Sequence, residues 1–209
     1  SAQDAPQVNR VTVKDNKTVT AGGQGTELKE KVSFDHEITV FTNATYKVGE
    51  GRARPINEGQ VRNGQTTVRY PNGESYVGQV QDGLRSGRGI YSWPDGRKYT
   101  GTFERGFPNG QGIYSFPNGE KYQGDFVDNR RTGQGTYTWP DGRKYVGTFR
   151  DDVPNGTGRW TWPNGAHYEG DVLNDKRHGK GVMVEADGWR YEGDWVAGKK
   201  HGQGVEITP

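Results

Sequence analysis

The chain has 209 residues, including 34 glycines and no cysteine, and its formal net charge is only +2. A chain of this length holds one or two domains, and without cysteine it can form neither disulfides nor cysteine-ligated zinc sites. Lys and Arg balance Asp and Glu in both parts of the chain, 10 against 9 in residues 1–75 and 18 against 17 in residues 76–209. Nucleic-acid-binding proteins usually concentrate positive charge on one domain or tail, so we expect no nucleic-acid partner. No apolar run approaches the roughly 18 residues that a membrane span needs.

The chain starts with a polar segment without periodicity, and residues 1–8 are predicted to be a disordered tail. The stretch from Ser1 to Pro6 has no initiator methionine, as after removal of an export signal or of a tag. Together with the lack of cysteine, this start favours a periplasmic or secreted protein over a cytoplasmic one, while it leaves the location open.

Residues 9–60 are predicted to form a small all-β unit, or an irregular cap on the strand that follows. Two β-rich runs within residues 10–20 flank Asp15 and Asn16, which indicates one hairpin. Residues 38–41 and 45–48 indicate a second hairpin. Neither hairpin keeps the spacing found in the rest of the chain.

The rest of the chain is built on a 23-residue repeat, which occurs six times between residues 76 and 209 without insertion or deletion. Each copy opens with Tyr-x-Gly and continues through Gly-x-Gly to two positions that are aromatic in the first four copies. The copies start at Tyr76, Tyr99, Tyr122, Tyr145, Tyr168 and Tyr191. The Gly-x-Gly pairs, which we interpret as structural glycines, are Gly87, Gly89, Gly110, Gly112, Gly133, Gly135, Gly156, Gly158, Gly179, Gly181, Gly202 and Gly204. Residues 61–75 match the second half of a degenerate first repeat, in which Thr66 replaces the second glycine.

Apolar and polar residues alternate within each repeat, which predicts two short strands. Turn residues separate the strands, as in the loop predicted over residues 106–110, so each repeat is predicted to be one hairpin. An isolated hairpin is marginal in water, so the hairpins must share a sheet and an apolar face. The sequence therefore predicts an all-β protein, in which residues 61–209 form an elongated single-layer β-solenoid of stacked hairpins after the small β-rich N-terminal unit.

This pattern resembles the MORN repeat (membrane occupation and recognition nexus), and the match covers residues 76–209 with a half-repeat before it. The resemblance implies that the hairpins stack into a twisted ribbon with aromatic side chains along one side. Members of this family include scaffold and organelle-tethering proteins, accessory domains of lipid kinases, and arrays proposed to bind phosphoinositides or to self-associate.

The aromatic residues of the first four repeats form a continuous stripe, which needs cover because each large ring can bury roughly 150–250 Å². The stripe is either the core between the strands or the lining of an open groove that takes a peptide, a glycan ring or another chain. The candidate residues of such a binding face are Tyr91, Trp93, Tyr99, Tyr114, Phe116, Tyr122, Tyr137, Trp139, Tyr145, Trp160 and Trp162.

Basic residues recur near the predicted hairpin tips and could contact anionic phospholipid, at roughly 1 kcal/mol per cation. The candidate lipid contacts are Arg85, Arg130, Arg131, Lys176, Arg177, Lys199 and Lys200. Acidic residues in or beside the same loops would cancel much of this charge, and these are Asp82, Asp128, Asp151, Asp152 and Asp175. The alternative interpretation is a set of solvated turns that keep the sheet edges soluble.

The pattern contains no constellation of catalytic or metal-binding residues. The Gly-x-Gly pairs lead into strands, whereas phosphate-binding glycine loops open helices. His178 and His201 occupy equivalent places in adjacent repeats, about 10 Å apart, which is too far for both to bind one metal. We therefore expect no enzyme activity, no catalytic or metal-binding residues, no cofactor and no small-molecule substrate.

The sequence favours a non-catalytic scaffold that binds a protein partner, or associates with its own copy, through the β-ribbon. One alternative is a peripheral membrane adaptor that binds anionic phospholipid through the basic hairpin tips. Another is a protein that binds a glycan on its aromatic face.

Overall fold

The computed structural model describes residues 7–11, 38–42, 64–70 and 72–209. Contacts divide the chain into two units, residues 1–108 and 109–209, and each unit is described by itself. Every regular element among the described residues is a β-strand, and no helix occurs there. The all-β prediction is therefore confirmed.

In the first unit the strands pair in chain order. They are β1 (Gln7–Val11), β2 (Ile38–Thr42), β3 (Gly64–Arg69), β4 (Ser75–Gln81), β5 (Leu84–Ser92) and β6 (Lys98–Glu104). The β1–β2 pair is antiparallel, the β2–β3 pair is parallel and the following pairs are antiparallel. Residues 12–20 and 45–48, which hold the second arms of the two predicted N-terminal hairpins, lie outside the described residues. β1 begins inside the predicted tail of residues 1–8 and pairs with β2. Because most residues before residue 61 lie outside the described ranges, the domain boundaries in this part of the chain stay a prediction.

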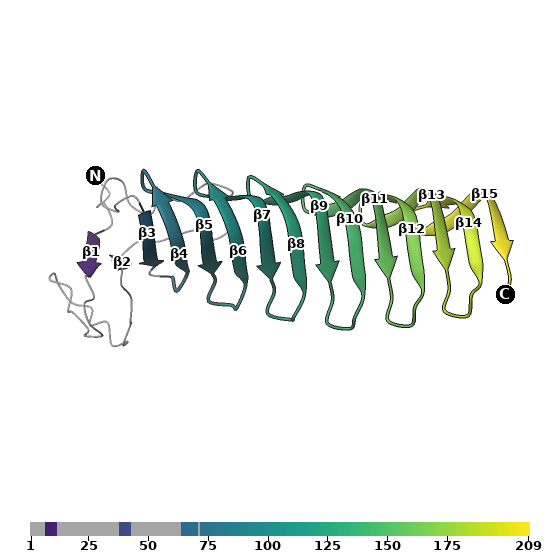
Figure 1. Cartoon of the computed structure of the whole chain (residues 1–209), viewed down its shortest axis with the longest axis horizontal. Coiled ribbons are helices and arrows are strands. Elements are labelled where there is room, and N and C mark those ends of the chain that lie inside the picture. The colour runs from purple at the N-terminus through teal and green to yellow at the C-terminus, as the bar shows by residue number, and fades with distance from the viewer. Residues whose placement is uncertain (1–6, 12–37, 43–63, 71) are drawn as a thin grey trace, which may run out of the picture. The chain divides into compact units, whose positions relative to one another are not determined.

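In the second unit each strand pairs antiparallel with the next (Figure 1). The strands are β7 (Phe107–Ser115), which crosses the unit boundary, β8 (Lys121–Val127), β9 (Arg130–Thr138), β10 (Lys144–Arg150), β11 (Val153–Thr161), β12 (His167–Leu173), β13 (Lys176–Val184), β14 (Arg190–Val196) and β15 (Lys199–Ile207). Two strands per repeat, one after the other in the sheet, confirm the predicted array of hairpins.

The two strands of each hairpin are joined by a tight turn of two residues that both have positive φ. Asp128 and Asn129 show this geometry, with φ values of 46° and 66°. It is the type I′ turn, whose twist matches that of the paired strands. The loop predicted over residues 106–110 is shorter than expected, because the turn consists of Arg105 and Gly106 and β7 starts directly afterwards.

The glycines of the Tyr-x-Gly and Gly-x-Gly motifs have different structural roles, which Gly124, Gly133 and Gly135 of the third repeat illustrate. Gly133 has a φ of +80° and lies at a bulge, where the pairing of β8 with β9 shifts its register. Gly124 and Gly135 lie opposite each other under the ring of Tyr122, and a Cβ on Gly135 would come closer than 3.0 Å to three atoms of that side chain. Gly133 therefore lets the strand bend, and Gly124 and Gly135 make room for the ring of Tyr122.

The core is a row of tyrosines, one per repeat, each lying on the glycines of its own hairpin. Those without exposed surface are Tyr76, Tyr99, Tyr122, Tyr145 and Tyr168. The hydroxyl of Tyr122 donates to the backbone carbonyl of Asp125 at 2.9 Å, so the buried oxygen is satisfied. Phe126 and Phe149 pack edge-on against Tyr122, with ring centroids 5.2 and 4.9 Å away. In both units the buried apolar surface is thus concentrated around the tyrosine of each hairpin.

Candidate functional site

The predicted aromatic face divides into a buried and a half-exposed set. Tyr99, Tyr122 and Tyr145 are completely buried, so the prediction that they contact a ligand is wrong, because they fill the space above the paired glycines. Tyr91 and Tyr137 are also buried, with 6% and 9% of their surface exposed. For these five residues the core interpretation of the stripe holds.

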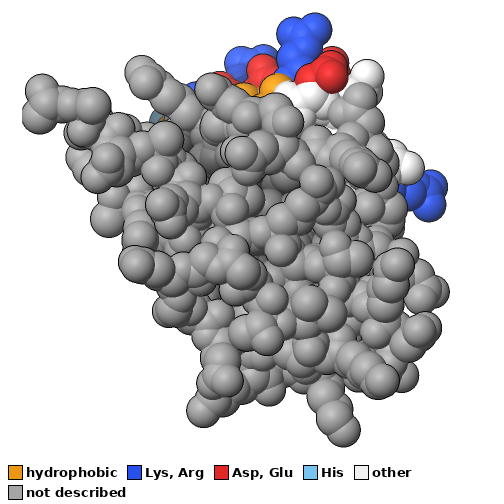
Figure 2. Space-filling model, turned by 90° about the vertical axis from the view of Figure 1, so that its left-hand side faces the viewer, with side chains coloured by type: hydrophobic (Ala, Val, Ile, Leu, Met, Phe, Trp, Pro, Cys, Tyr) orange, Lys and Arg blue, Asp and Glu red, His pale blue; other side chains and the backbone are white. Residues whose placement is uncertain are grey.

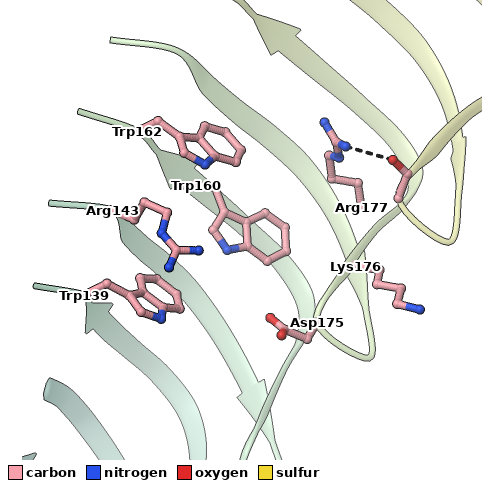
Figure 3. Close-up of a pocket in the computed structure, with 8 residues that line it drawn as sticks. Trp139, Arg143, Trp160, Trp162, Asp175, Lys176 and Arg177 are labelled. Carbon is pink, nitrogen blue, oxygen red and sulfur yellow. Dashed lines mark hydrogen bonds between the residues drawn. The ribbon is translucent and has the colours of Figure 1, made fainter. Parts of the chain in front are cut away.

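The half-exposed set consists of Trp93, Tyr114, Phe116, Trp139, Trp160 and Trp162. The last three line one groove of about 320 Å³ in the second unit, which we call the tryptophan groove (Figure 3). Its other lining residues are Arg143, Asp175, Lys176, Arg177 and Gly198. The structure therefore brings together three of the predicted aromatic residues and two of the predicted basic ones.

The tryptophan groove forms because the strands bend at their bulges. The carboxyl ends of β9 and β11 thereby face the tight turns that precede β13 and β15 across one hollow. Trp139 and Trp162 follow directly after β9 and β11, whereas Trp160 lies within β11. Asp175 belongs to the tight turn before β13, and Gly198 to the tight turn before β15. Figure 3 shows the three tryptophans on one side of the hollow and the β13 residues on the other.

Tryptophan 160 is held by the core below it. Trp160 packs between Tyr145 and Tyr168, with ring centroids 4.8 and 5.9 Å away. Trp139 packs against Tyr137, with centroids 4.6 Å apart. Two of the three indole rings are therefore fixed by aromatic neighbours before any ligand arrives.

Arg143 covers part of the groove wall. Its guanidinium carbon lies 5.0 Å from the ring centroid of Trp139, and its Nε donates to Asp141 at 2.7 Å. The backbone N–H of Arg143 and then its guanidinium hold the pKa of Asp141 below its ordinary value. Sequence reasoning missed Arg143 as a groove residue. The signal that could have found it is the recurring Trp-Pro-Asp-Gly-Arg segment, since Arg97 lies over Trp93 in the same way, at 5.1 Å.

The opposite wall carries three charged residues, Asp175, Lys176 and Arg177. Arg177 donates from Nη2 to the carbonyl of Gly198 at 2.8 Å, and its guanidinium carbon lies 4.4 Å from the Trp195 ring centroid. Burial lowers the pKa of Arg177 below its ordinary value. Although Asp175 is an exposed residue, the packing around its carboxyl group desolvates the charge and raises its pKa.

The predicted line of basic residues does not form one positive surface. Arg85 is only 7% exposed and donates to the carbonyl of Gly106, so the prediction that it contacts lipid is wrong. Three others are paired with carboxylates: Arg130 with Asp151, Arg131 with Asp152 and Lys200 with Glu206, at 3.2, 3.3 and 2.8 Å. Lys176 and Lys199 are exposed and make no ion pair with a described residue. At the upper edge of Figure 2, where several described side chains are visible, basic and acidic groups lie side by side.

The described residues contain no group of three or more His, Asp or Glu side chains placed to hold a metal ion. They also contain no helix long and apolar enough to cross a bilayer.

The family model of the MORN repeat matches the chain six times, over residues 76–96, 99–121, 122–142, 145–167, 168–190 and 191–209. The chain belongs to the MORN repeat family. The matched repeats contain every residue of the tryptophan groove except Arg143. No curated protein matches the sequence.

Several solved structures show weak similarity to this chain, each at low sequence identity and with a TM-score below 0.5. The TCP domain of SAS-4 (dCPAP) from Drosophila melanogaster, in complex with a proline-rich motif of Ana2, is 17% identical with a TM-score of 0.42 and covers 68% of this chain and 83% of its own. A mutant TCP10 domain of CPAP from Danio rerio is 15% identical with a TM-score of 0.34 and covers 68% and 71%. The wild-type TCP10 domain from Danio rerio, in complex with a STIL peptide, is 17% identical with a TM-score of 0.29 and covers 68% and 67%.

Proposed function

We propose that this protein is a non-catalytic interaction scaffold, which holds an extended segment of a partner protein in the tryptophan groove. A MORN-repeat array fits such a scaffold, and the observation that carries the proposal is the hollow lined by Trp139, Trp160 and Trp162. Tryptophan and arginine are the residue types that most often dominate binding energy at protein interfaces. Here three indole rings and two guanidinium groups line the same hollow.

The groove is suited to binding because its walls are already ordered. Trp160 packs between Tyr145 and Tyr168, and the tight turns that form the other wall are tied together through the backbone. The N–H of Asp175 donates to the carbonyl of Pro154 at 3.0 Å, and the N–H of Gly198 donates to Arg177 at 2.9 Å. A preorganised site loses less conformational entropy on binding than a flexible one.

The other ligand classes have less support. Anionic lipid would need a continuous set of exposed cations at the hairpin tips, but Arg85 is buried and Arg130 and Arg131 are paired with aspartates, which leaves Lys176 and Lys199 as the exposed candidates without an ion pair to a described residue. A glycan would stack on open indole faces, but Arg143 lies over the ring of Trp139. Self-association is the second candidate. All nine residues of β15 are exposed, among them two aliphatic side chains with 61% and 49% of their surface exposed, Val205 and Ile207.

Selection of a displayed library of random twelve-residue peptides on the full chain tests the proposal. Trp162→Ala is the decisive variant, since the Trp162 ring packs against no other aromatic ring among the described residues. We expect it to weaken the selected peptides by about 2 kcal/mol, or roughly thirtyfold. Trp93→Ala, at the equivalent place in the first unit, is the matched control and should leave their affinity unchanged. Equal binding by both variants would contradict the proposal, and light scattering that detects a dimer would favour the second candidate.

A further inference from the structure

One arginine site occurs three times in the described residues, at intervals of 46 residues, or two repeats: Arg85 is buried there, and Arg131 and Arg177 are half-buried. At the first site Arg85 donates to the carbonyl of Gly106 and to the hydroxyl of Tyr70, at distances of 2.9 to 3.1 Å. Its guanidinium carbon lies 4.9 Å from the ring centroid of Tyr91, and the hydroxyl of Tyr91 donates to the buried carboxylate of Glu74. The first arginine thus shares its cluster with an acid of the same chain.

The second site repeats this arrangement and adds another acid. Arg131 donates from Nε to Asp152 at 3.3 Å, and its guanidinium carbon lies 5.8 Å from the ring centroid of Tyr137. The hydroxyl of Tyr137 donates to Glu120, which stands 46 residues after Glu74. The charge of the second arginine is therefore balanced from within the array.

The third site has lost the acids. Ala166 stands where the other two sites have Glu74 and Glu120, and Gly198 stands where the second site has Asp152 and the first has Gly106. Among the described residues Arg177 makes no ion pair. Its Nη2 donates to the carbonyl of Gly198, and its Nη1 faces only the sulfur of Met183 at 3.8 Å, which is a weak acceptor. Glu185 attracts the charge from beyond ion-pair distance.

A partly buried guanidinium without a carboxylate partner is unfavourable, and an anion that reaches it gains a charge-assisted hydrogen bond. Arg177 lies across the tryptophan groove from the indole rings, with the exposed Lys176 beside it (Figure 3). Asp175 is the one acid among the groove-lining residues, and it pairs with neither cation. The groove therefore combines a positive wall with an apolar aromatic wall.

We infer that the groove takes an acidic peptide segment, in which an Asp or Glu side chain pairs with Arg177 and a neighbouring apolar side chain packs on Trp160 and Trp162. The inference rests on the proposed function, because it specifies the chemistry of the segment bound in the same groove. It also accounts for the replacement of the internal glutamate by Ala166 at this site, since the carboxylate comes from the partner.

Gly198 offers a matched pair of variants. Its φ is +84°, close to the φ of +73° that Asp152 adopts at the equivalent place, and a Cβ on Gly198 would meet no atom within 4 Å. Both Gly198→Asp and Gly198→Asn should therefore fold, since both side chains tolerate this conformation. The aspartate supplies the missing internal acid, as Asp152 does for Arg131, whereas the asparagine has the same shape without the charge.

The experiment measures affinities of peptides selected from the random twelve-residue library on the full chain. We expect the selected peptides to contain Asp or Glu beside an apolar residue, and to bind at least tenfold more weakly when that acid is replaced by its amide. Gly198→Asp should bind the acidic peptides at least tenfold more weakly than Gly198→Asn, which adds a side chain of the same shape without the charge, with thermal unfolding confirming that both are folded. Equal affinity for the two variants, or selected peptides that depend on Trp162 but carry no acid, overturns this inference and leaves the proposed function standing. Selected peptides that do not depend on Trp162 overturn the proposed function itself.

Discussion

Gly135 is the position where one added carbon atom should have the clearest effect on the fold. We predict that Gly135→Ala destabilises the protein by about 2 kcal/mol, because the new Cβ would come closer than 3.0 Å to three atoms of the Tyr122 side chain. The ring cannot move aside, since it has no exposed surface and Phe126 and Phe149 pack edge-on against it. Overpacking costs about 1–3 kcal/mol, and replacing glycine within a strand offsets about 0.5–1 kcal/mol of this. Because the surroundings of the ring are rigid, we take the overpacking cost at the upper end of its range, which leaves a net loss of about 2 kcal/mol.

Urea unfolding followed by tryptophan fluorescence measures this change. With a slope of about 2 kcal/mol per M, the midpoint of Gly135→Ala should fall by roughly 1 M. In a Tyr122→Leu background, where the ring is missing, the same alanine should cost at least about 1 kcal/mol less. A midpoint within about 0.2 M of the wild type, or an equal cost in both backgrounds, would refute the described packing of ring on glycine.

Two further predictions concern charged groups. In urea unfolding, Arg85→Ala should destabilise the fold by about 3 kcal/mol, because it leaves the hydrogen-bond partners of a buried guanidinium unsatisfied. Arg130→Ala should cost less than about 1 kcal/mol, because that side chain is 63% exposed. Equal costs would contradict the assigned burial. Burial raises the pKa of Asp175 above 3.8, so its ionised form is disfavoured in the folded state and its relative contribution to stability declines as the pH rises. Asp175→Asn should therefore raise the thermal unfolding midpoint at neutral pH. At about pH 3 the midpoint should not change, because the aspartate of the wild type is then largely protonated and as neutral as the amide that replaces it. Asp141 has a lowered pKa and contributes stability above its ordinary pKa, so Asp141→Asn should lower the neutral-pH midpoint. The same sign for both substitutions would contradict this assignment.

The fold was predictable because each rule it uses is local. Period-2 alternation and a fixed 23-residue spacing indicate hairpins in one sheet, and the observed strands follow that spacing. The turn lengths were less predictable, because a type I′ turn is usually signalled by Asn-Gly or Asp-Gly, and here Asp128 and Asn129 adopt positive φ instead. The strand pairing of β1 with β2 joins segments far apart in sequence, which no local signal encodes.

The candidate site was only partly predictable. The aromatic residues stood out by spacing, but spacing could not separate Tyr145, which has no exposed surface, from Trp162, which lines a groove. Both are aromatic and recur once per repeat; the bend at each bulge decides which one faces outward. Arg177 was identified only as one of several basic residues, because its interactions depend on Gly198, 21 positions later in the sequence.

Two periods are superimposed in this chain, and they separate what maintains the array from what distinguishes its fifth repeat. The 23-residue period carries the tyrosine, its glycines and the turns, so it must hold everywhere for neighbouring hairpins to pack. The 46-residue period carries Arg85, Arg131 and Arg177, which alternate with Pro108 and Pro154 at the same place. Departures from a locally consistent pattern are expected where a protein has a further role. In the second period the departure at the fifth repeat is Ala166, which stands where the other two sites have a glutamate, and Gly198 leaves the arginine that lines the tryptophan groove without the aspartate of the second site.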